Sequence, residues 1–454
     1  MRLAGREARA ISEPMLRLKH ELESGKAVFG ELIEPCGSDI LVRQVPATPT
    51  PTGRTGMSDP HEHRVDEVVV TYFAKPHSYT TDDIIEISAH GSPVVLRHIV
   101  ELALAAGARL AEPGEFTMRA FLNGRIDLTQ AEAVRDLIDS QTLYQAKVAA
   151  QQLDGALSRR LQPTKQKLVE LIAVLEAGID FAEDDVSVLP AAQILEHIAP
   201  IRAPLEELAR SFSYGKVVHE GLTLAIVGRP NVGKSSLFNC LVERERAIVT
   251  ATPGTTRDLV TETVSLGGIP IRLVDTAGIR RALDEAESIG IQKSLEALAD
   301  ADLVLVVIDA SQPISPEDKT LLDQVEQRAA MLVQNKADLA SSTSTSGTGK
   351  PTIHTSAVTG QGIPELRDAI LRHVTGDAGA SAESGFLTNA RHQKLVQDSI
   401  TALDAARTAT NNRIPHEMIL LDLYSALKAL DEIAGATTTD DILNLIFSRF
   451  CIGK

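Results

Sequence analysis

The sequence has few cysteines and no long apolar run, and each shortage excludes a class of protein. Its three cysteines, Cys36, Cys240 and Cys451, are widely separated and form no CxxC or Cys/His pair. A zinc site or a disulfide framework is therefore not expected. No apolar run approaches the roughly twenty residues that span a bilayer, and the first residues lack the apolar stretch of a secretory signal. We therefore expect a cytoplasmic protein with no membrane segment.

The chain also lacks net positive charge. Its formal net charge of −16 opposes nonspecific attraction to nucleic acid, so contact with RNA would need a local basic patch or a partner protein. The 454 residues exceed what one core of ordinary size contains, and the composition is near the globular average. We therefore expect about two or three packed domains.

The N-terminal region mixes strand and helix signals. Short β-like runs occur at 67–72 and 83–88, and the stretch 93–106 has helical spacing. These signals predict a small α+β domain over residues 1–117. The intervening stretch 46–63 is rich in turn-forming residues and is expected to be an exposed loop.

Helical periodicity follows and later returns. Apolar residues such as Leu161, Leu168 and Leu171 recur along one stripe, which is typical of a helix with one buried face. Similar spacing reappears near the C-terminus. We therefore expect one helical domain that combines residues 118–215 with residues 378–454.

The segment between these helical parts, residues 216–377, alternates strand and helix signals. Compact apolar runs of the kind that is buried in parallel sheets occur at 222–227, 271–274, 303–308 and 331–333. The predicted fold is therefore a multidomain α/β protein with an N-terminal α+β domain, a central helical domain and an inserted Ras-like P-loop GTPase domain.

A phosphate-binding loop is the strongest motif. Gly228–Ser235 reads GRPNVGKS, and it lies between the apolar run 222–227 and a helix signal, as a strand-loop-helix cradle requires. Glycines let backbone N–H groups curl around phosphate oxygens. Lys234 supplies a cation to the β- and γ-phosphates, and the Ser235 hydroxyl can coordinate Mg2+.

Two further motifs fit a nucleotide switch. The sequence DTAG at 275–278 follows a strand signal, so a carboxylate can reach magnesium and a glycine N–H can meet the γ-phosphate. The threonine-rich stretch 250–258 suits a mobile switch loop, although taken alone it resembles an ordinary turn. The order and spacing of these motifs predict an NTP-hydrolysing domain.

The motif NKAD at 335–338 selects the base. A carboxylate at Asp338 accepts hydrogen bonds from guanine N1–H and N2–H2, whereas it would face an adenine lone pair. Backbone N–H groups of residues 355–357 can complete the pocket toward the guanine carbonyl, and Asn335 is expected to brace the loops. An isolated NKAD is a common surface turn, but in order with the other motifs it predicts a guanine-nucleotide site.

Ile279 follows DTAG, so no glutamine is available there to orient the attacking water. Glu287, in the acidic stretch 284–288, is a candidate to orient or deprotonate that water. The alternative interpretation is a solvated charge at a helix start.

Taken together, these motifs resemble the MnmE (TrmE) family of tRNA-modification GTPases, within the TrmE-Era-EngA-YihA-Septin-like GTPases. The resemblance covers nearly the whole chain, because it also includes AHGSP at 89–93, PGEF at 113–116, RAFLN at 119–123, LTQAEA at 128–133 and CIGK at 451–454. It implies a folate-binding dimerisation domain, a helical domain and a GTPase domain that closes on its counterpart in a homodimer. It also implies action with MnmG, as a heterotetramer, at the wobble uridine (position 34) of certain tRNAs.

The resemblance and the motifs assign roles to individual residues. Potassium ligands fall on Asn231, Thr250, Thr252 and Thr255, and magnesium ligands on Ser235 and Thr256. The family's catalytic glutamate falls on Glu287, and folate-binding positions on Arg2, Glu86, Arg125 and Lys454. The implied cofactors are GTP, Mg2+, K+ and a 5-formyl- or 5,10-methylene-type tetrahydrofolate. The expected GTP contacts are Asn231, Val232, Gly233, Lys234, Ser235, Ser236, Thr250, Ala251, Thr252, Pro253, Gly254, Thr255, Thr256, Asp275, Thr276, Ala277, Gly278, Asn335, Lys336, Asp338, Ser356 and Ala357.

One departure and two alternatives remain open. Family members carry a strand segment before the point that matches Met1, so a misassigned start codon or a truncation is expected, which puts folate binding in doubt. A ribosome-assembly GTPase of the Era or EngA type would not be expected to share the N-terminal region or CIGK. A folate enzyme with an inert nucleotide domain fits poorly with the full set of guanine and magnesium motifs. Cys451 is left without a role.

Overall fold

The computed structural model describes residues 1–34, 63–180, 189–242, 261–275, 301–340, 351–375 and 385–435. The chain divides into two compact units, with the boundary after Glu132, inside helix α4 (Leu128–Asp139). The predicted fold class is confirmed, since an α+β part, a helical part and an α/β part are all present. The residue boundaries predicted for the three domains stay predictions.

The first unit contains an antiparallel five-stranded sheet in the order β1-β5-β4-β3-β2. Alternate residues of β4, such as Val68 and Val70, are buried and pack with Ile99 of α2 in one cluster. The sheet therefore has one face in the core. Its elements are β1 (Arg2–Ala4), α1 (Ala8–Ser12), η1 (Glu13–Met15), β2 (Leu16–Leu18), β3 (Ala27–Glu34), β4 (His63–Phe73), β5 (Ile84–Ser88), α2 (Pro93–Ala105) and α3 (Glu115–Leu122).

A six-stranded sheet lies in the second unit, in the order β11-β10-β9-β6-β8-β7. Its strands are parallel except for β7, which pairs antiparallel with β8. All residues of β9 and β10 are buried, as expected for strands that are covered on both faces. The elements are β6 (Leu222–Val227), α8 (Lys234–Val242), β7 (Thr261–Leu266), β8 (Ile269–Asp275), β9 (Leu303–Asp309), α11 (Pro316–Gln324), β10 (Ala330–Asn335), η3 (Ala337–Leu339), β11 (Thr352–His354) and α12 (Ile363–Thr375).

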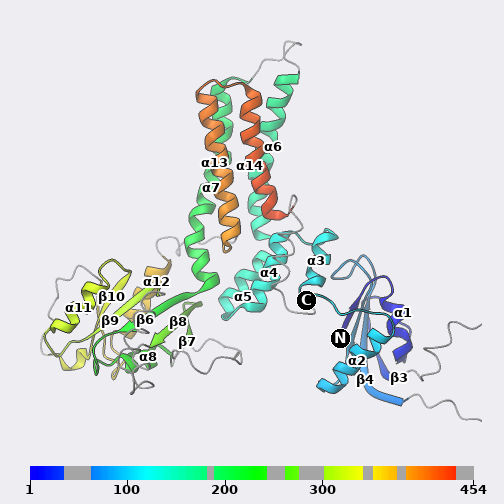
Figure 1. The fold of residues 1–454 in the computed structure, drawn as a ribbon, viewed down its shortest axis with the longest axis horizontal. Coiled ribbons are helices and arrows are strands. Elements are labelled where there is room, and N and C mark those ends of the chain that lie inside the picture. The colour runs from blue at the N-terminus through cyan, green and yellow to red at the C-terminus, as the bar shows by residue number, and fades with distance from the viewer. Residues whose placement is uncertain are drawn as a thin grey trace, which may run out of the picture. The chain divides into compact units, whose positions relative to one another are not determined.

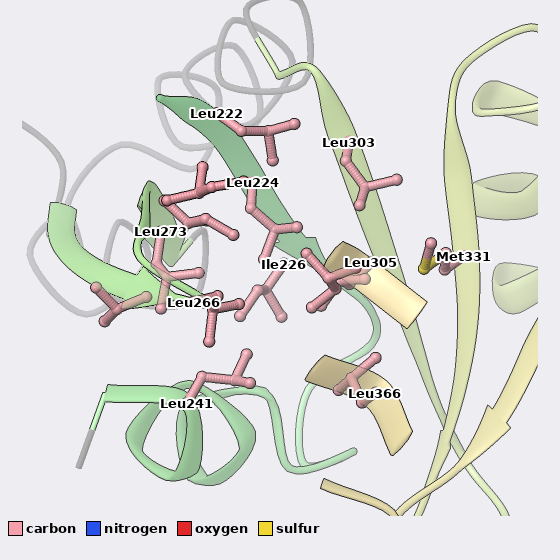
Figure 2. Close-up of a cluster of buried hydrophobic side chains, with 14 of the residues drawn as sticks. Leu222, Leu224, Ile226, Leu241, Leu266, Leu273, Leu303, Leu305, Met331 and Leu366 are labelled. Carbon is pink, nitrogen blue, oxygen red and sulfur yellow. The ribbon is translucent and has the colours of Figure 1, made fainter. Parts of the chain in front are cut away.

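Leucine, valine and isoleucine form most of the core on one side of this sheet. Figure 2 shows Leu224 and Leu273 from neighbouring strands, with Leu241 of α8 and Leu366 of α12 facing the same cluster. A separate cluster, which includes Val306, packs on the other side. The sheet is therefore held between two apolar layers.

Four long helices of the second unit pack side by side (Figure 1). They are α6 (Ala156–Asp180), α7 (Ala191–Glu220), α13 (Ala390–Asn411) and α14 (His416–Ala434). One cluster joins Leu168 of α6, Leu205 of α7, Leu403 of α13 and Leu423 of α14. Segments on both sides of the α/β insert therefore form one core, as the returning helical pattern predicts.

The helical and α/β parts of this unit also share contacts. The Thr142 hydroxyl, just before α5 (Leu143–Leu153), donates to Gly268 O of the α/β part at 2.6 Å. The Gln145 side-chain amide of α5 donates to Val218 O of α7 at 2.9 Å, and Val218 belongs to the core cluster of the six-stranded sheet. Tyr214 of α7 also belongs to that cluster, and its hydroxyl shares a hydrogen bond of 2.8 Å with the Tyr144 hydroxyl of α5. Among the residues that the structure describes, no helix is both long and apolar enough to cross a membrane.

Candidate guanine-nucleotide site

The carboxyl ends of the parallel strands gather the predicted nucleotide motifs at one edge of the sheet. Strand β6 leads into Gly228, β8 ends at Asp275 and β10 ends at Asn335. Strand β9, between β6 and β10, ends at Asp309. Open α/β sheets bind ligands beyond this edge, because the loops that follow neighbouring strands meet there.

Two glycines shape the phosphate loop. A Cβ on Gly228 would lie 2.3 Å from Val307 O, so the loop passes too close to β9 for a side chain. Gly233 has a φ of +94°, and a Cβ there would lie 2.2 Å from Asn335 Nδ2. Asn231 also adopts a left-handed backbone conformation, with a φ of +63°. The loop therefore makes the tight turn of a backbone cradle, as its sequence predicts.

Lys234 begins helix α8 and points back into the loop. Its ammonium donates to Gly228 O at 2.9 Å and to Arg229 O at 2.7 Å, and the residue is 8% exposed. Ser235 and Ser236 follow in the first turn of α8. Backbone N–H groups and the helix dipole at a helix N-terminus favour an anion, so this cation and this helix start both suit phosphate.

Asn335 joins three segments of the site. Its side-chain amide donates to Val232 O in the phosphate loop at 2.9 Å. Its carbonyl oxygen accepts from the Thr355 hydroxyl at 3.3 Å and from Ala357 N–H at 3.1 Å. At 2% exposure this amide is almost fully buried. The predicted brace is therefore present in the structure, and it fixes the NKAD motif against the phosphate loop.

The remaining base-side residues lie around this brace. Asp338 is exposed in η3, and the Lys336 ammonium donates to Asp309 Oδ2 at 2.7 Å. Ser356 N–H donates to Gln361 O, while Ala357 N–H donates to Asn335. Both N–H groups thus have protein acceptors here, and a guanine carbonyl would have to share or replace one. Their predicted role in base recognition stays a prediction.

Sequence reasoning missed two acids of this edge. Asp309 follows the apolar run of β9 directly, and Asp318, 1% exposed, accepts from Arg229 Nε of the phosphate loop at 2.8 Å. Asp318 also forms a capping box with Ser315 at the start of α11. An acid at the end of a buried strand and the S-x-x-D pattern of a cap were the available signals. Neither signal identifies the partner, because both partners are distant in sequence.

Other predicted residues lie outside the part of the chain that the structure describes. These are Thr250, Ala251, Thr252, Pro253, Gly254, Thr255, Thr256, Thr276, Ala277, Gly278, Glu287 and Lys454. Their predicted roles in switching, cation binding, catalysis and folate binding are therefore untested.

The predicted folate residues of the first unit do not share one described site. Arg2 and Glu86 face each other across β1 and β5 and form an ion pair of 2.6 Å. The Arg125 guanidinium instead lies 5.6 Å from the ring centre of Tyr79. A cavity of about 920 Å³ is lined by Arg2, Phe116 and others, but neither Glu86 nor Arg125 belongs to its lining. Arg2 is thus the one described folate candidate on this cavity.

Comparisons with known proteins cover the whole chain. Family models described as "GTP-binding protein TrmE N-terminus" and "MnmE helical domain" match residues 1–125 and 128–451. The tRNA modification GTPase MnmE of Koribacter versatilis (strain Ellin345) is 65% identical over 458 residues, covering 100% of this chain and 95% of that protein. The protein of the same name from Aquifex aeolicus (strain VF5) is 41% identical, with coverages of 100% and 96%.

A solved structure of the G domain of the T. maritima FeoB iron transporter is 30% identical over 34% of this chain and 98% of that one. Its TM-score of 0.27 is too low to support an argument. The family models and the full-length relatives, in contrast, match both units, and they confirm the resemblance that the motifs predicted. The chain therefore belongs to the MnmE family of tRNA modification GTPases, enzymes that hydrolyse GTP.

Proposed function

We propose that this GTPase is activated by potassium and acts with MnmG to form an aminomethyl-type group, such as 5-carboxymethylaminomethyl, at the wobble uridine of certain tRNAs. The observation that supports the nucleotide part most directly is the Asn335 brace, which joins the phosphate loop to the NKAD motif and to residues 355–357. Such a brace places the base-reading and phosphate-binding segments in a fixed relation, which GTP hydrolysis requires.

Each described residue has a defined part in this proposal. Lys234 would neutralise the β- and γ-phosphates, and the start of α8 would supply N–H donors to them. Asp338, which is exposed beside the brace, would accept from the guanine N1–H and N2–H2 groups. A negative carboxylate at this position disfavours adenine, so the site is proposed to be specific for guanine nucleotides.

The residues around the loop fit the proposed cations. Ser235 is in the first turn of α8, directly after the phosphate loop, and its hydroxyl would be a Mg2+ ligand. Asn231 adopts the left-handed conformation within the same loop and supplies a side-chain oxygen for K+. Bound cations would stabilise the negative charge that develops in phosphoryl transfer. The remaining proposed ligands are Thr256 for Mg2+ and Thr250, Thr252 and Thr255 for K+.

Glu287 is proposed to orient or deprotonate the attacking water, since Ile279 stands where other GTPases carry a glutamine. The test measures GTP hydrolysis in potassium and in sodium at equal ionic strength for wild type, Glu287→Ala and the neighbouring control Glu285→Ala. We expect potassium stimulation that is lost in Glu287→Ala without loss of GTP binding and is kept in Glu285→Ala. Equal rates in both salts would contradict the cation assignment and favour a ribosome-assembly function.

The tRNA part of the proposal needs a separate test. Nucleoside analysis of tRNA from a strain that lacks the gene should show loss of the wobble modification, and expression of this chain together with MnmG should restore it. A normal modification level in the deletion strain would refute this part. The homodimer is tested by light scattering with GTP, potassium and a transition-state mimic, and a monomer under these conditions would exclude closure of paired GTPase domains.

Folate binding is proposed for the first unit, with action in the cytoplasm. Arg2 lines the cavity of about 920 Å³, and its guanidinium suits the carboxylates of a tetrahydrofolate. The Arg2–Glu86 pair is about one-third exposed, so Arg2 can exchange this partner at low cost. Calorimetric titration with 5-formyltetrahydrofolate should show binding that Arg2→Ala weakens. Unchanged binding in Arg2→Ala would remove Arg2 from the site.

A further inference from the structure

Asp309 lies outside the four nucleotide motifs, yet it contacts one of them. It ends β9 and pairs in register with Asn335 at the end of β10. Its Oδ1 atom accepts from Ser311 N–H at 2.9 Å and from the Ser311 hydroxyl at 2.6 Å, and its Oδ2 atom accepts from the Lys336 ammonium at 2.7 Å. Both oxygens of this carboxylate, which is 5% exposed, are thus occupied by donors.

Lys336 occupies a strained point of the chain. Its φ of +63° and ψ of 35° lie in the left-handed region, which is unfavourable for a residue with a side chain. The chain turns here from the buried Asn335 into η3, which carries Asp338. Surrounding contacts must offset this cost for the turn to persist. The described contacts include Ala337 N–H to Thr355 O at 3.0 Å and the ion pair to Asp309.

Charge and burial make Asp309 suited to this task. Burial alone would raise its pKa, but hydrogen bonds from Lys336 and Ser311 outweigh burial and hold the pKa of Asp309 below its ordinary value. The carboxylate is therefore ionised at neutral pH. A buried carboxylate that is fully hydrogen-bonded holds a lysine side chain in one place, whereas an unpaired lysine side chain samples many rotamers.

We propose that Asp309 is a positioning residue for guanine-nucleotide binding, which acts by holding Lys336 and thereby the turn that carries Asp338. This inference rests on the proposed guanine site. The base-reading carboxylate is presented by a strained turn, and Asp309 fixes that turn from a neighbouring strand. Loss of Asp309 lowers nucleotide affinity, while the hydrolysis step at saturating GTP is unaffected, because the phosphate side of the site keeps its own contacts.

The test measures the dissociation constant of a fluorescent GDP analogue and kcat at saturating GTP for four forms of the full chain: wild type, Asp309→Asn, Lys336→Met and the double variant. In Asp309→Asn an amide N–H2 can face the ammonium, so attraction is lost with little change in size. We expect about tenfold weaker GDP binding, with kcat within about twofold of wild type. The double variant should bind GDP no more weakly than Lys336→Met alone, because Asp309 acts through Lys336.

Two further variants guard against a folding artefact. Ser311→Ala changes an exposed residue and removes one donor to Asp309, so GDP binding should weaken by about threefold in the wild type but not in Lys336→Met. Asp302→Asn is the matched control, because Asp302 lies just before β9, at the opposite end from Asp309, and accepts from Thr223 N–H at 2.8 Å. Asp302→Asn should bind GDP like wild type.

The outcomes separate this inference from the proposed function. If wild type binds no guanine nucleotide, the proposed site itself is wrong. If wild type binds GDP and Asp309→Asn binds equally well, the positioning role is overturned. It is also overturned if Asp309→Asn weakens GDP binding by the same factor in the wild type and in Lys336→Met. A fall in kcat with unchanged GDP affinity would overturn it as well.

Discussion

The two sheets of this protein bury their residues in different ways. In β9 of the six-stranded sheet every residue is buried, whereas in β4 of the five-stranded sheet buried and partly exposed residues alternate over Val68–Val70. The central parallel strands β9 and β10 are covered on both faces, so the functional polar residues Asp309 and Asn335 stand at their ends. The antiparallel sheet has one face outside the core, and charged residues such as Arg2 and Glu86 pair there along its length. Strand direction thus determines where each sheet can place functional side chains.

The largest expected effect comes from adjacent core residues of β9. Leu305 and Val306 point to opposite faces but are both fully buried, in different clusters. We expect Leu305→Ala to cost about 3 kcal/mol and Val306→Ala about 2 kcal/mol, because each leaves a cavity. Hydrogen exchange of β9 amides in the full chain measures both losses.

Alanine substitutions at two adjacent residues of β4 should, in contrast, give different stability losses. Val70 is fully buried and Val69 is partly exposed. We expect Val70→Ala to cost about 1.5 kcal/mol and Val69→Ala clearly less. Equal stability losses for Val69→Ala and Val70→Ala would contradict the comparison between the two sheets. So would stability losses for Leu305→Ala and Val306→Ala that differ by more than the sizes of the removed side chains explain.

Ion pairs should follow the same contrast. Asp318 is 1% exposed beside the phosphate loop, whereas the Arg2–Glu86 pair is about one-third exposed. Asp318→Asn should destabilise the six-stranded sheet by about 2 kcal/mol, because Arg229 loses a buried charged acceptor. Glu86→Gln should change stability by less than about 1 kcal/mol. Both losses can be measured by denaturant titration with hydrogen exchange as the readout. A larger loss of stability for Glu86→Gln than for Asp318→Asn would refute this contrast.

Acid should weaken the first unit through Glu115. The Arg109 guanidinium donates to both of its carboxylate oxygens, at 2.8 and 2.5 Å, and this pairing holds the pKa of Glu115 below its ordinary value. Because the pKa of Glu115 is lower in the folded state, ionised Glu115 stabilises the fold at pH values above its unfolded pKa near 4.5. This stabilisation is lost as the pH falls through the folded pKa. Arg109→Gln should therefore cost about 1 kcal/mol at pH 7 and progressively less below pH 4.5, as measured by thermal unfolding.

The smallest expected effect is a loss of stability of the second unit at high pH, through His219. The Asp136 carboxylate lies 3.0 Å from its Nε2 atom and raises the pKa of His219 above the ordinary 6.5. Because the pKa of His219 is higher in the folded state, protonated His219 stabilises the fold fully at pH values below 6.5. This stabilisation is lost as the pH rises through the folded pKa. A pair that is only partly buried contributes at most about 1 kcal/mol, so His219→Gln should lower the unfolding temperature by less than about 4 °C below pH 6.5, and hardly at all at high pH.

His197→Gln is the matched control for this measurement. The His197 ring lies 2.7 Å from Gln193 O, and the residue is exposed in the same unit. Because this ring contacts a backbone carbonyl and not a carboxylate, its substitution should not reproduce the loss of stability expected for His219→Gln below pH 6.5. A His219→Gln variant that parallels wild type at every pH would show that the pair with Asp136 does not contribute.

Local sequence predicted the elements with long, continuous patterns. The apolar runs at 222–227 and 303–308 are confirmed as β6 and β9, and the leucine stripe that begins at Leu161 is confirmed within α6. Short strands such as β1 and β11 were not predicted, because three residues are too few to show a period. His63 was assigned to a loop, but it begins β4 and pairs with Glu34 of β3.

The sequence by itself determined the family, the fold class and the nucleotide motifs, because each motif is a short run whose spacing carries its chemistry. Only the tertiary structure decided which distant groups complete the site. Asp309 meets Lys336, and Asp318 meets Arg229, across 27 and 89 positions of sequence. Parallel pairing of β9 with β10 brings the first pair together, and packing of α11 beside the phosphate loop brings the second. The position of a carboxylate in the sequence does not show which cation it will pair with, because the pair forms only where the fold buries the two groups beside each other.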